Sequence, residues 1–178
     1  LQAVPEATPA AAQARLFTGM SQLQLKQTEN ARGSLALARQ LAADSSLAVE
    51  VAFQQARLEQ EAGMPAAAAD LFTQIAGRWP QDSRAPLCLA NALDLYLSTG
   101  NQTAAAAAWT QLLEKQSDYA KQPRQQVLHS RLLLSTKQTD EAAAVLRAVL
   151  QTGDAEQTPV ARYYLIRAEA EAGRHASV

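Results

Sequence analysis

The sequence has few of the residues from which chemical sites are built. Its 178 residues include one cysteine, Cys88, and two histidines, His129 and His175. A single cysteine excludes an internal disulfide and a cysteine-based zinc site, and the histidines lack the close spacing of a metal-binding pair. Cys88 is expected to be a small buried side chain, and His129 a partly buried structural residue within a helix.

Catalytic motifs are missing too. No serine stands in a Gly-x-Ser-x-Gly turn, and no glycine-rich loop is present that could hold a phosphate. The carboxylates of Glu59 and Glu61, like those of Glu169 and Glu171, are two residues apart, so on a helix they point in different directions. We therefore expect no enzymatic activity, no catalytic residue, no cofactor and no metal site.

The charges are balanced and the apolar runs are short. With 16 basic and 17 acidic residues the net charge is −1, and no cluster of lysine or arginine occurs. Nucleic-acid-binding proteins usually carry a basic face, so nucleic acid is not an expected partner. No apolar run approaches the roughly 20 residues that span a bilayer, so no membrane span is expected.

Helix-forming residues are what the sequence has in abundance. Alanine makes up roughly a fifth of the chain, far above its ordinary share, whereas Gly and Pro number seven each and aromatic residues make up 5%. This composition favours helices over strands and predicts an all-α fold. Residues 1–8 are expected to be a linker and residues 9–178 a helical domain. Because the chain begins with leucine, we expect a fragment of a longer protein.

The helical pattern is broken at regular intervals. Gly63 and Gly100 are 37 residues apart, and Gly173 follows after 73 more, nearly two such steps. Glycine commonly follows a helix end because it adopts the left-handed conformation without steric cost. The missing break is expected near Lys137. A fixed step of 36–37 residues indicates a repeat array.

Two further markers follow the same step. Pro86, Pro123 and Pro159 all lie at one constant distance before a break, and proline is favoured in the first turn of a helix. A large apolar residue lies nine residues after each of the breaks at Gly63, Gly100 and Lys137, with a small residue four positions earlier on the same helix face. These pairs, which we expect in the core, are Ala68/Phe72, Ala105/Trp109 and Ala142/Leu146.

Three segments resemble the second half of a tetratricopeptide repeat (TPR): AGMPAAAADLFTQIAGRWP, TGNQTAAAAAWTQLLEKQSD and TKQTDEAAAVLRAVLQTGD. In the first half of the repeat, Tyr96 stands at the family's aromatic position, whereas Glu59 and Glu169 stand there in other units. The resemblance implies a right-handed α-solenoid of antiparallel helix hairpins with about 4.5 repeats, the last one truncated after Gly173. The step exceeds the family's usual length of about 34 residues, as in extended bacterial arrays of envelope scaffolds.

The breaks predict helix pairs at 9–27 with 31–43, 46–62 with 65–78, 84–99 with 102–116, and 123–136 with 139–151, followed by a helix at 159–172. Counting back from Phe72 by the family's usual step reaches Ala38, so the large apolar marker is missing from the first pair. The first pair is therefore predicted to be a degenerate capping unit.

In this family the first helix of each pair lines a concave groove that binds peptides or partner helices. The groove positions carried over from the resemblance are Phe53, Arg57, Asp94, Leu97, Val127, Arg131, Leu134, Tyr164 and Arg167. Arg57, Arg131 and Arg167 share one position in three units, and arginine holds carboxylates with paired hydrogen bonds. Two interpretations stay open: the arginines bind an acidic or C-terminal peptide segment, or they form salt bridges between neighbouring helices, for example with Asp94.

The resemblance implies a protein-interaction scaffold or adaptor with a protein or peptide partner. A regulatory or substrate-positioning domain of a larger enzyme is the alternative, and self-assembly into a homo-oligomer is a third. For the compartment, the extended repeats and the composition favour the bacterial periplasm or cell envelope, with the cytoplasm as the alternative.

Overall fold

The chain folds into helices alone. The computed structural model describes residues 8–42 and 47–174, and within these residues it has ten helices and no strand. The helices are α1 (Pro9–Gln24), α2 (Thr28–Ala42), α3 (Ala48–Glu61), α4 (Pro65–Arg78), α5 (Ala85–Ser98), α6 (Gln102–Lys115), α7 (Ser117–Ala120), α8 (Pro123–Ser135), α9 (Thr139–Gln151) and α10 (Thr158–Glu171). The all-α prediction is confirmed. The predicted linker, apart from Thr8, and His175 lie outside the described residues.

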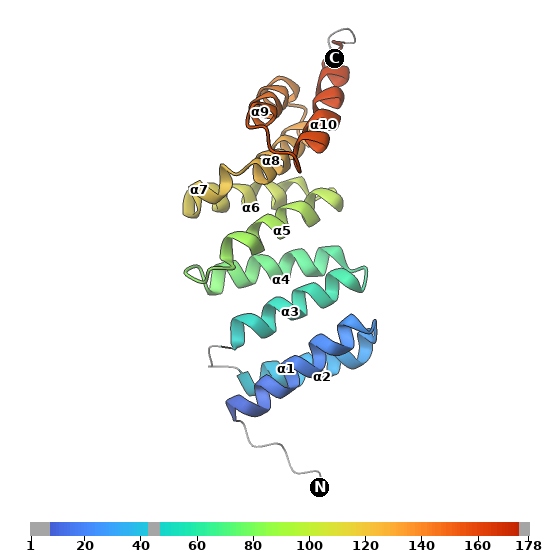
Figure 1. The fold of residues 1–178 in the computed structure, drawn as a ribbon, viewed down its shortest axis with the longest axis vertical. Helices are drawn as coiled ribbons and strands as arrows, with labels where there is room; N and C mark the ends of the chain where they lie inside the picture. The colour runs from blue at the N-terminus through green and yellow to red at the C-terminus, as the bar shows by residue number, and fades with distance from the viewer. Residues whose placement is uncertain (1–7, 43–46, 175–178) are drawn as a thin grey trace. The chain divides into compact units, whose positions relative to one another are not determined.

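The helices pack in consecutive pairs (Figure 1). The chain divides into two compact units, Leu1–Cys88 and Leu89–Val178. The boundary lies within α5, which begins in the first unit and ends in the second. In the first unit α1 packs against α2, α2 against α3, and α3 against α4. In the second unit α6 packs against α8, and α9 packs against both α8 and α10.

The turns that close the helix pairs share one backbone geometry. All the predicted breaks have a positive φ, namely Gly63, Gly100, Lys137 and Gly173 at 65–74°, and Lys26 joins them at 57°. After each break, the next residue donates its backbone N–H to the carbonyl five positions earlier, as in Asn101 to Tyr96 at 2.9 Å. This bond satisfies a carbonyl that the helix end would otherwise leave unpaired. The prediction of a break near Lys137 is confirmed.

The break at Lys26 corrects the prediction for the first pair. Counting nine residues from Lys26 reaches Leu35, and four positions earlier stands Ala31; both side chains are fully buried. The first pair therefore carries the same small-and-large marker as the others. The prediction of a degenerate unit was wrong because it applied the family's usual step, which is shorter than the step from Lys26 to Gly63 in this chain.

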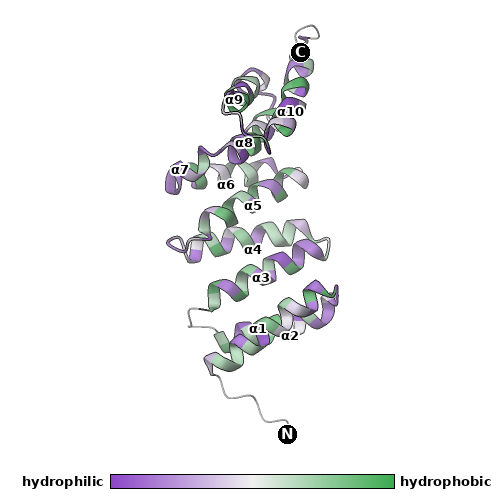
Figure 2. Cartoon of the chain, in the orientation of Figure 1, coloured by the Kyte–Doolittle hydropathy of each residue, from purple (hydrophilic) through white to green (hydrophobic). Residues whose placement is uncertain are grey.

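The other marker residues lie in the core as predicted. Phe72 and Leu146 are fully buried, Trp109 is nearly so, and the alanine four positions before each has no exposed surface. Trp109 stacks on the partly buried His129 with ring centroids 4.3 Å apart, and burial lowers the pKa of that imidazole below 6.5. Cys88 is also buried, which raises the pKa of its thiol to about 12. Figure 2 shows that hydrophobic and hydrophilic residues share every long helix, as expected for helices with one packed face.

The two glutamates at the aromatic position form ion pairs, and Glu169 is buried whereas Glu59 is partly buried. Glu59 of α3 accepts a hydrogen bond from Arg32 of α2, and this bond raises the pKa of the Arg32 guanidinium. Glu169 of α10 accepts from Arg147 of α9 and from Arg174. In both places an arginine reaches a carboxylate on the first helix of the following pair. In these two units an ion pair therefore occupies the position at which the third unit has the aromatic ring of Tyr96.

Two helical glycines offer a matched test of the α1–α2 contact. A Cβ atom added at Gly19 would lie 2.7 Å from Cγ of the fully buried Leu35, whereas one added at Gly33 meets nothing within 4 Å. We expect Gly33→Ala to stabilise the protein by about 0.5–1 kcal/mol through helix propensity. Gly19→Ala should destabilise it by about 1 kcal/mol or more, because overpacking outweighs that gain. Urea denaturation followed by circular dichroism measures both, and equal effects would contradict the tight contact.

Within residues 8–42 and 47–174, no helix is both long enough and apolar enough to cross a bilayer. Over the same residues, no group of three or more potential metal ligands comes together.

Candidate functional site

Five of the nine predicted groove residues line one cavity in the second unit. This cavity, called the arginine groove below, has a volume of about 290 Å³. Its wall comes from α5, α8, α10 and the turn after α8, and consists of Leu97, Arg131, Leu134, Ser135, Lys137, Tyr164, Arg167 and Glu171. The α8 and α10 helices are in contact, so equivalent positions of successive repeats lie side by side. The repeat thus places Arg131 and Arg167 in the same wall.

Two guanidinium groups flank one aromatic ring in this groove. Arg131 and Arg167 lie 5.7 Å and 5.8 Å from the centroid of the Tyr164 ring. Both distances are within the range at which a cation is attracted to an aromatic face. Tyr164 therefore contacts a guanidinium group from each of two successive repeats.

Both arginines also have a carboxylate partner. Arg131 of α8 forms an ion pair with Asp94 of α5, one repeat earlier, and Arg167 pairs with Glu171 one turn later on α10 at 3.2 Å. Lys137 reaches the same Glu171 at 3.4 Å. The second interpretation of the arginines, salt bridges between neighbouring helices, thus describes Arg131 in this structure. It does not describe Arg167, whose partner is on its own helix.

The charges of the groove do not cancel. Its wall holds three cations, Arg131, Lys137 and Arg167, and one carboxylate, Glu171. Adding Asp94, which pairs with Arg131, still leaves one net positive charge. Burial raises the pKa of Glu171, but hydrogen bonds from Arg167 and Lys137 outweigh it and the net shift is downward. Glu171 is therefore ionised at neutral pH.

Neither arginine uses all of its hydrogen-bond donors. The bond from Arg131 to Asp94 uses Nη1, and the bond from Arg167 to Glu171 uses Nη2. A guanidinium has five N–H donors in a fixed planar fork, so further donors remain on each side chain. Both side chains therefore keep hydrogen-bond donors beyond those used in the existing pairs.

The other predicted groove residues lie elsewhere. Val127 is only 4% exposed and packs with Leu146 in the core, so it offers no free surface. It was assigned to the groove by counting, and its side chain faces the second helix of its own pair. Phe53 belongs to the first unit, where its ring meets that of Phe72 edge-on at 5.5 Å.

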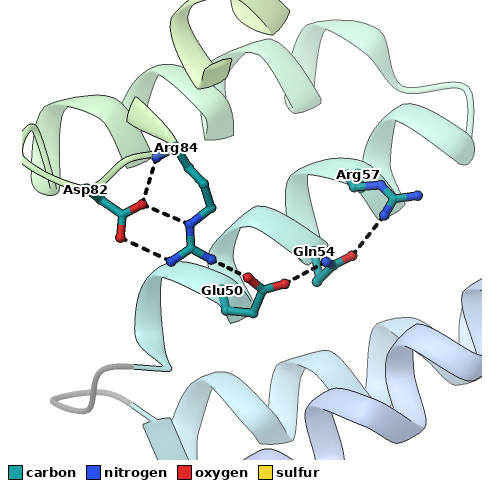
Figure 3. A network of polar contacts seen from close by, with 5 residues as sticks. All are labelled: Glu50, Gln54, Arg57, Asp82 and Arg84. Atoms are coloured by element: carbon teal, nitrogen blue, oxygen red, sulfur yellow. Dashed lines mark hydrogen bonds and ion pairs between the residues drawn. The ribbon is translucent and has the colours of Figure 1, made fainter. Parts of the chain in front are cut away.

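Arg57, the third member of the predicted row, takes part in a polar chain along α3 in the first unit (Figure 3). It donates to Gln54 at 3.5 Å, and Gln54 donates to Glu50 at 2.7 Å. Glu50 in turn pairs with Arg84, which is held by Asp82 at 2.8 Å. Arg57 also pairs with Glu61 one turn later, at 3.2 Å. The chain of contacts connects α3 to the segment before α5.

Three residues of the groove were missed by the sequence prediction, namely Ser135, Lys137 and Glu171. Lys137 was recognised as a break but not as a charged wall residue. Glu171 was noted only as one of two carboxylates that point in different directions on a helix. A signal was present, because Glu61 and Glu171 each stand four residues after an arginine of the predicted row, at a spacing that favours ion pairs.

A second cavity, of about 470 Å³, lies in the first unit between α2, α3 and α4. Leu71 and Ile75 contribute apolar surface, and the polar groups come from Arg39, Arg78 and three glutamines, Gln40, Gln55 and Gln74. Arg78 lies over the ring of Trp79, 4.6 Å from its centroid. None of the predicted groove residues lines this cavity.

Comparison with known proteins places the chain in no family: no family model matches it, and no curated protein matches it either. The resemblance to tetratricopeptide repeats therefore rests on the residues of this chain.

Proposed function

We propose that this chain is a protein-interaction scaffold of the tetratricopeptide type, a right-handed solenoid without catalytic activity, and that its arginine groove binds an acidic segment of a partner protein. The shared turn geometry at regularly spaced breaks supports the repeat architecture. The observation that carries the function is the pair of guanidinium groups around Tyr164, with an excess of positive charge in the groove wall.

An acidic peptide fits this groove in chemistry as well as in charge. Carboxylates accept two parallel hydrogen bonds from a guanidinium, and such charge-assisted bonds are among the stronger ones in proteins. Leu97 and Leu134 add apolar surface beside the charges, which suits a segment that alternates acidic and apolar residues. A free C-terminus would supply one further carboxylate.

The test is capture of peptides with free C-termini from a random library, with the intact chain immobilised. We expect the recovered peptides to be acidic, and Arg131→Glu/Arg167→Glu to weaken their binding by about tenfold or more, because each lost charged hydrogen bond is worth about 1.5–3 kcal/mol. The matched control is Arg124→Glu/Arg162→Glu, which changes exposed arginines of the same two helices by the same charge. Equal binding by the groove variant and the control variant would refute the proposed site.

A further inference from the structure

The cavity of about 470 Å³ in the first unit has a polar rim and an apolar floor. Arg39, Gln40, Gln74 and Arg78 are exposed along its rim, whereas Ile75 is only 2% exposed at its floor. Its volume is within the range of ligand-binding clefts, about 300–1,000 Å³. This cavity, called the α2–α4 cavity below, shares no residue with the arginine groove.

The wall of the α2–α4 cavity carries two positive charges. Arg39 comes from α2 and Arg78 from α4, and none of the described aspartates or glutamates lines the cavity. Neither guanidinium donates a hydrogen bond or forms an ion pair within residues 8–42 and 47–174. Arg78 instead lies over the ring of Trp79, and this contact holds the guanidinium while its N–H donors stay free. Charge complementarity therefore favours an anionic ligand.

Three glutamine side chains line the same cavity. Gln55 donates its Nε2 hydrogen to the backbone carbonyl of Leu35 at 3.4 Å, which leaves its Oε1 atom as an acceptor. The side-chain amides of Gln40 and Gln74 make no hydrogen bond to any residue that the structure describes. A primary amide donates and accepts, as a peptide group does. Together with the guanidinium groups, these amides suit a peptide backbone that carries carboxylates better than they suit a bare anion.

The repeat does not account for the two arginines. One and two repeats after Arg39 stand Ala76 and Leu113, and after Arg78 stand Lys115 and Thr152. Neither position therefore has a guanidinium in the following repeats, and the packing of the helices does not require one there.

The space of the cavity comes from small residues. Ala36, Ala48 and Ala52 all belong to its wall. One repeat after Ala52 stands Leu89, which is 2% exposed. The repeat thus accepts a leucine at this position, and the smaller side chain of Ala52 leaves room for a ligand.

We propose that the α2–α4 cavity is a binding site for an acidic segment of a partner protein in which two carboxylates flank one large apolar side chain. Arg39 and Arg78 hold the two carboxylates, because a guanidinium binds a carboxylate with paired hydrogen bonds. The apolar side chain lies on the floor beside Leu71 and Ile75, and the glutamines bind the peptide groups. This site goes beyond the proposed function, because it is built on other helices than the arginine groove and does not depend on it.

The probe is a rhodamine-labelled, C-terminally amidated peptide of sequence GSELEGS, and its binding to the intact chain is followed by fluorescence anisotropy. The chain carries Arg131→Ala/Arg167→Ala throughout, so that the arginine groove does not contribute and the two proposals fail separately. We expect Arg39→Glu/Arg78→Glu to weaken binding at least about tenfold, because charge-assisted hydrogen bonds are replaced by repulsion. Ala52→Leu should also weaken it at least about tenfold without changing any charge, because the larger side chain fills the cavity.

Arg15→Glu/Arg124→Glu is the matched control, because it changes two other exposed arginines by the same charge and should leave binding unchanged. Two peptides with the same label test the ligand. GSQLQGS should bind at least about tenfold more weakly because it has no carboxylate, and GSEGEGS at least about threefold more weakly because no side chain covers the floor.

Three results would overturn the proposal: equal binding by Arg39→Glu/Arg78→Glu and the matched control, equal binding of GSELEGS and GSQLQGS, or no binding at about 1 mM protein, the weak limit of specific affinity. Displacement of the peptide by an equal concentration of inorganic phosphate would overturn it too, because a small anion would then be the ligand.

Discussion

Phe72→Ala is expected to lower the free energy of unfolding of the first unit by about 3–5 kcal/mol, the usual cost of removing a buried phenylalanine. Phe72 is fully buried and its ring meets that of Phe53, so its removal leaves a cavity and also ends an aromatic contact. The closely packed α3 and α4 helices cannot collapse fully into this space, because their backbones are held by the turn at Gly63.

Urea denaturation followed by helical circular dichroism measures this effect. Phe17→Ala is the matched control, because Phe17 has the same side chain but is 55% exposed; it should cost less than about 1 kcal/mol, as surface substitutions usually do. If both variants unfold at the same urea concentration, Phe72 is not the core residue that the structure shows.

The second large effect is expected at Glu169. Its side chain is 7% exposed, and its two oxygens accept hydrogen bonds from Arg147 and Arg174. Arg147→Ala/Arg174→Ala leaves this carboxylate with neither guanidinium beside it, and a buried charge without a partner is destabilising, so the midpoint of thermal unfolding should fall. Thermal unfolding of the second unit, followed by helical circular dichroism, reports the loss.

Restoring neutrality should recover much of that stability. In the background of the two arginine variants, Glu169→Gln replaces the unpaired charge by an amide, whose burial is less unfavourable. A third variant, Glu169→Tyr, places at this position the residue that stands at its equivalent, Tyr96. The control for lost surface arginines is Arg124→Ala/Arg162→Ala. A double arginine variant as stable as this control would contradict the ionic packing at Glu169.

Much of the helical pattern is local and was therefore predictable. The ends of α4, α6, α8 and α9 lie within one residue of the predicted ranges, because glycine, proline and asparagine act on the backbone within one turn. The marker pairs were predictable for a similar reason, since residues four apart on a helix share a face in any fold. The prediction missed Leu35, because counting back by the family's shorter step led to Ala38 instead. The turn at Lys26 shows that Leu35 is the large apolar marker of the first pair.

The sequence alone determined that this chain is helical, that its helices pair at regular turns, and which face of each second helix enters the core. These properties depend on local backbone preferences and on the spacing of apolar residues, and both can be read directly from the sequence. Only the tertiary structure decided which groove candidates meet a cavity, because burial and ion pairing depend on side chains a whole repeat away. It placed Arg131, Tyr164 and Arg167 in one wall, showed Val127 to be part of the core, and paired Arg131 with Asp94 of the preceding repeat.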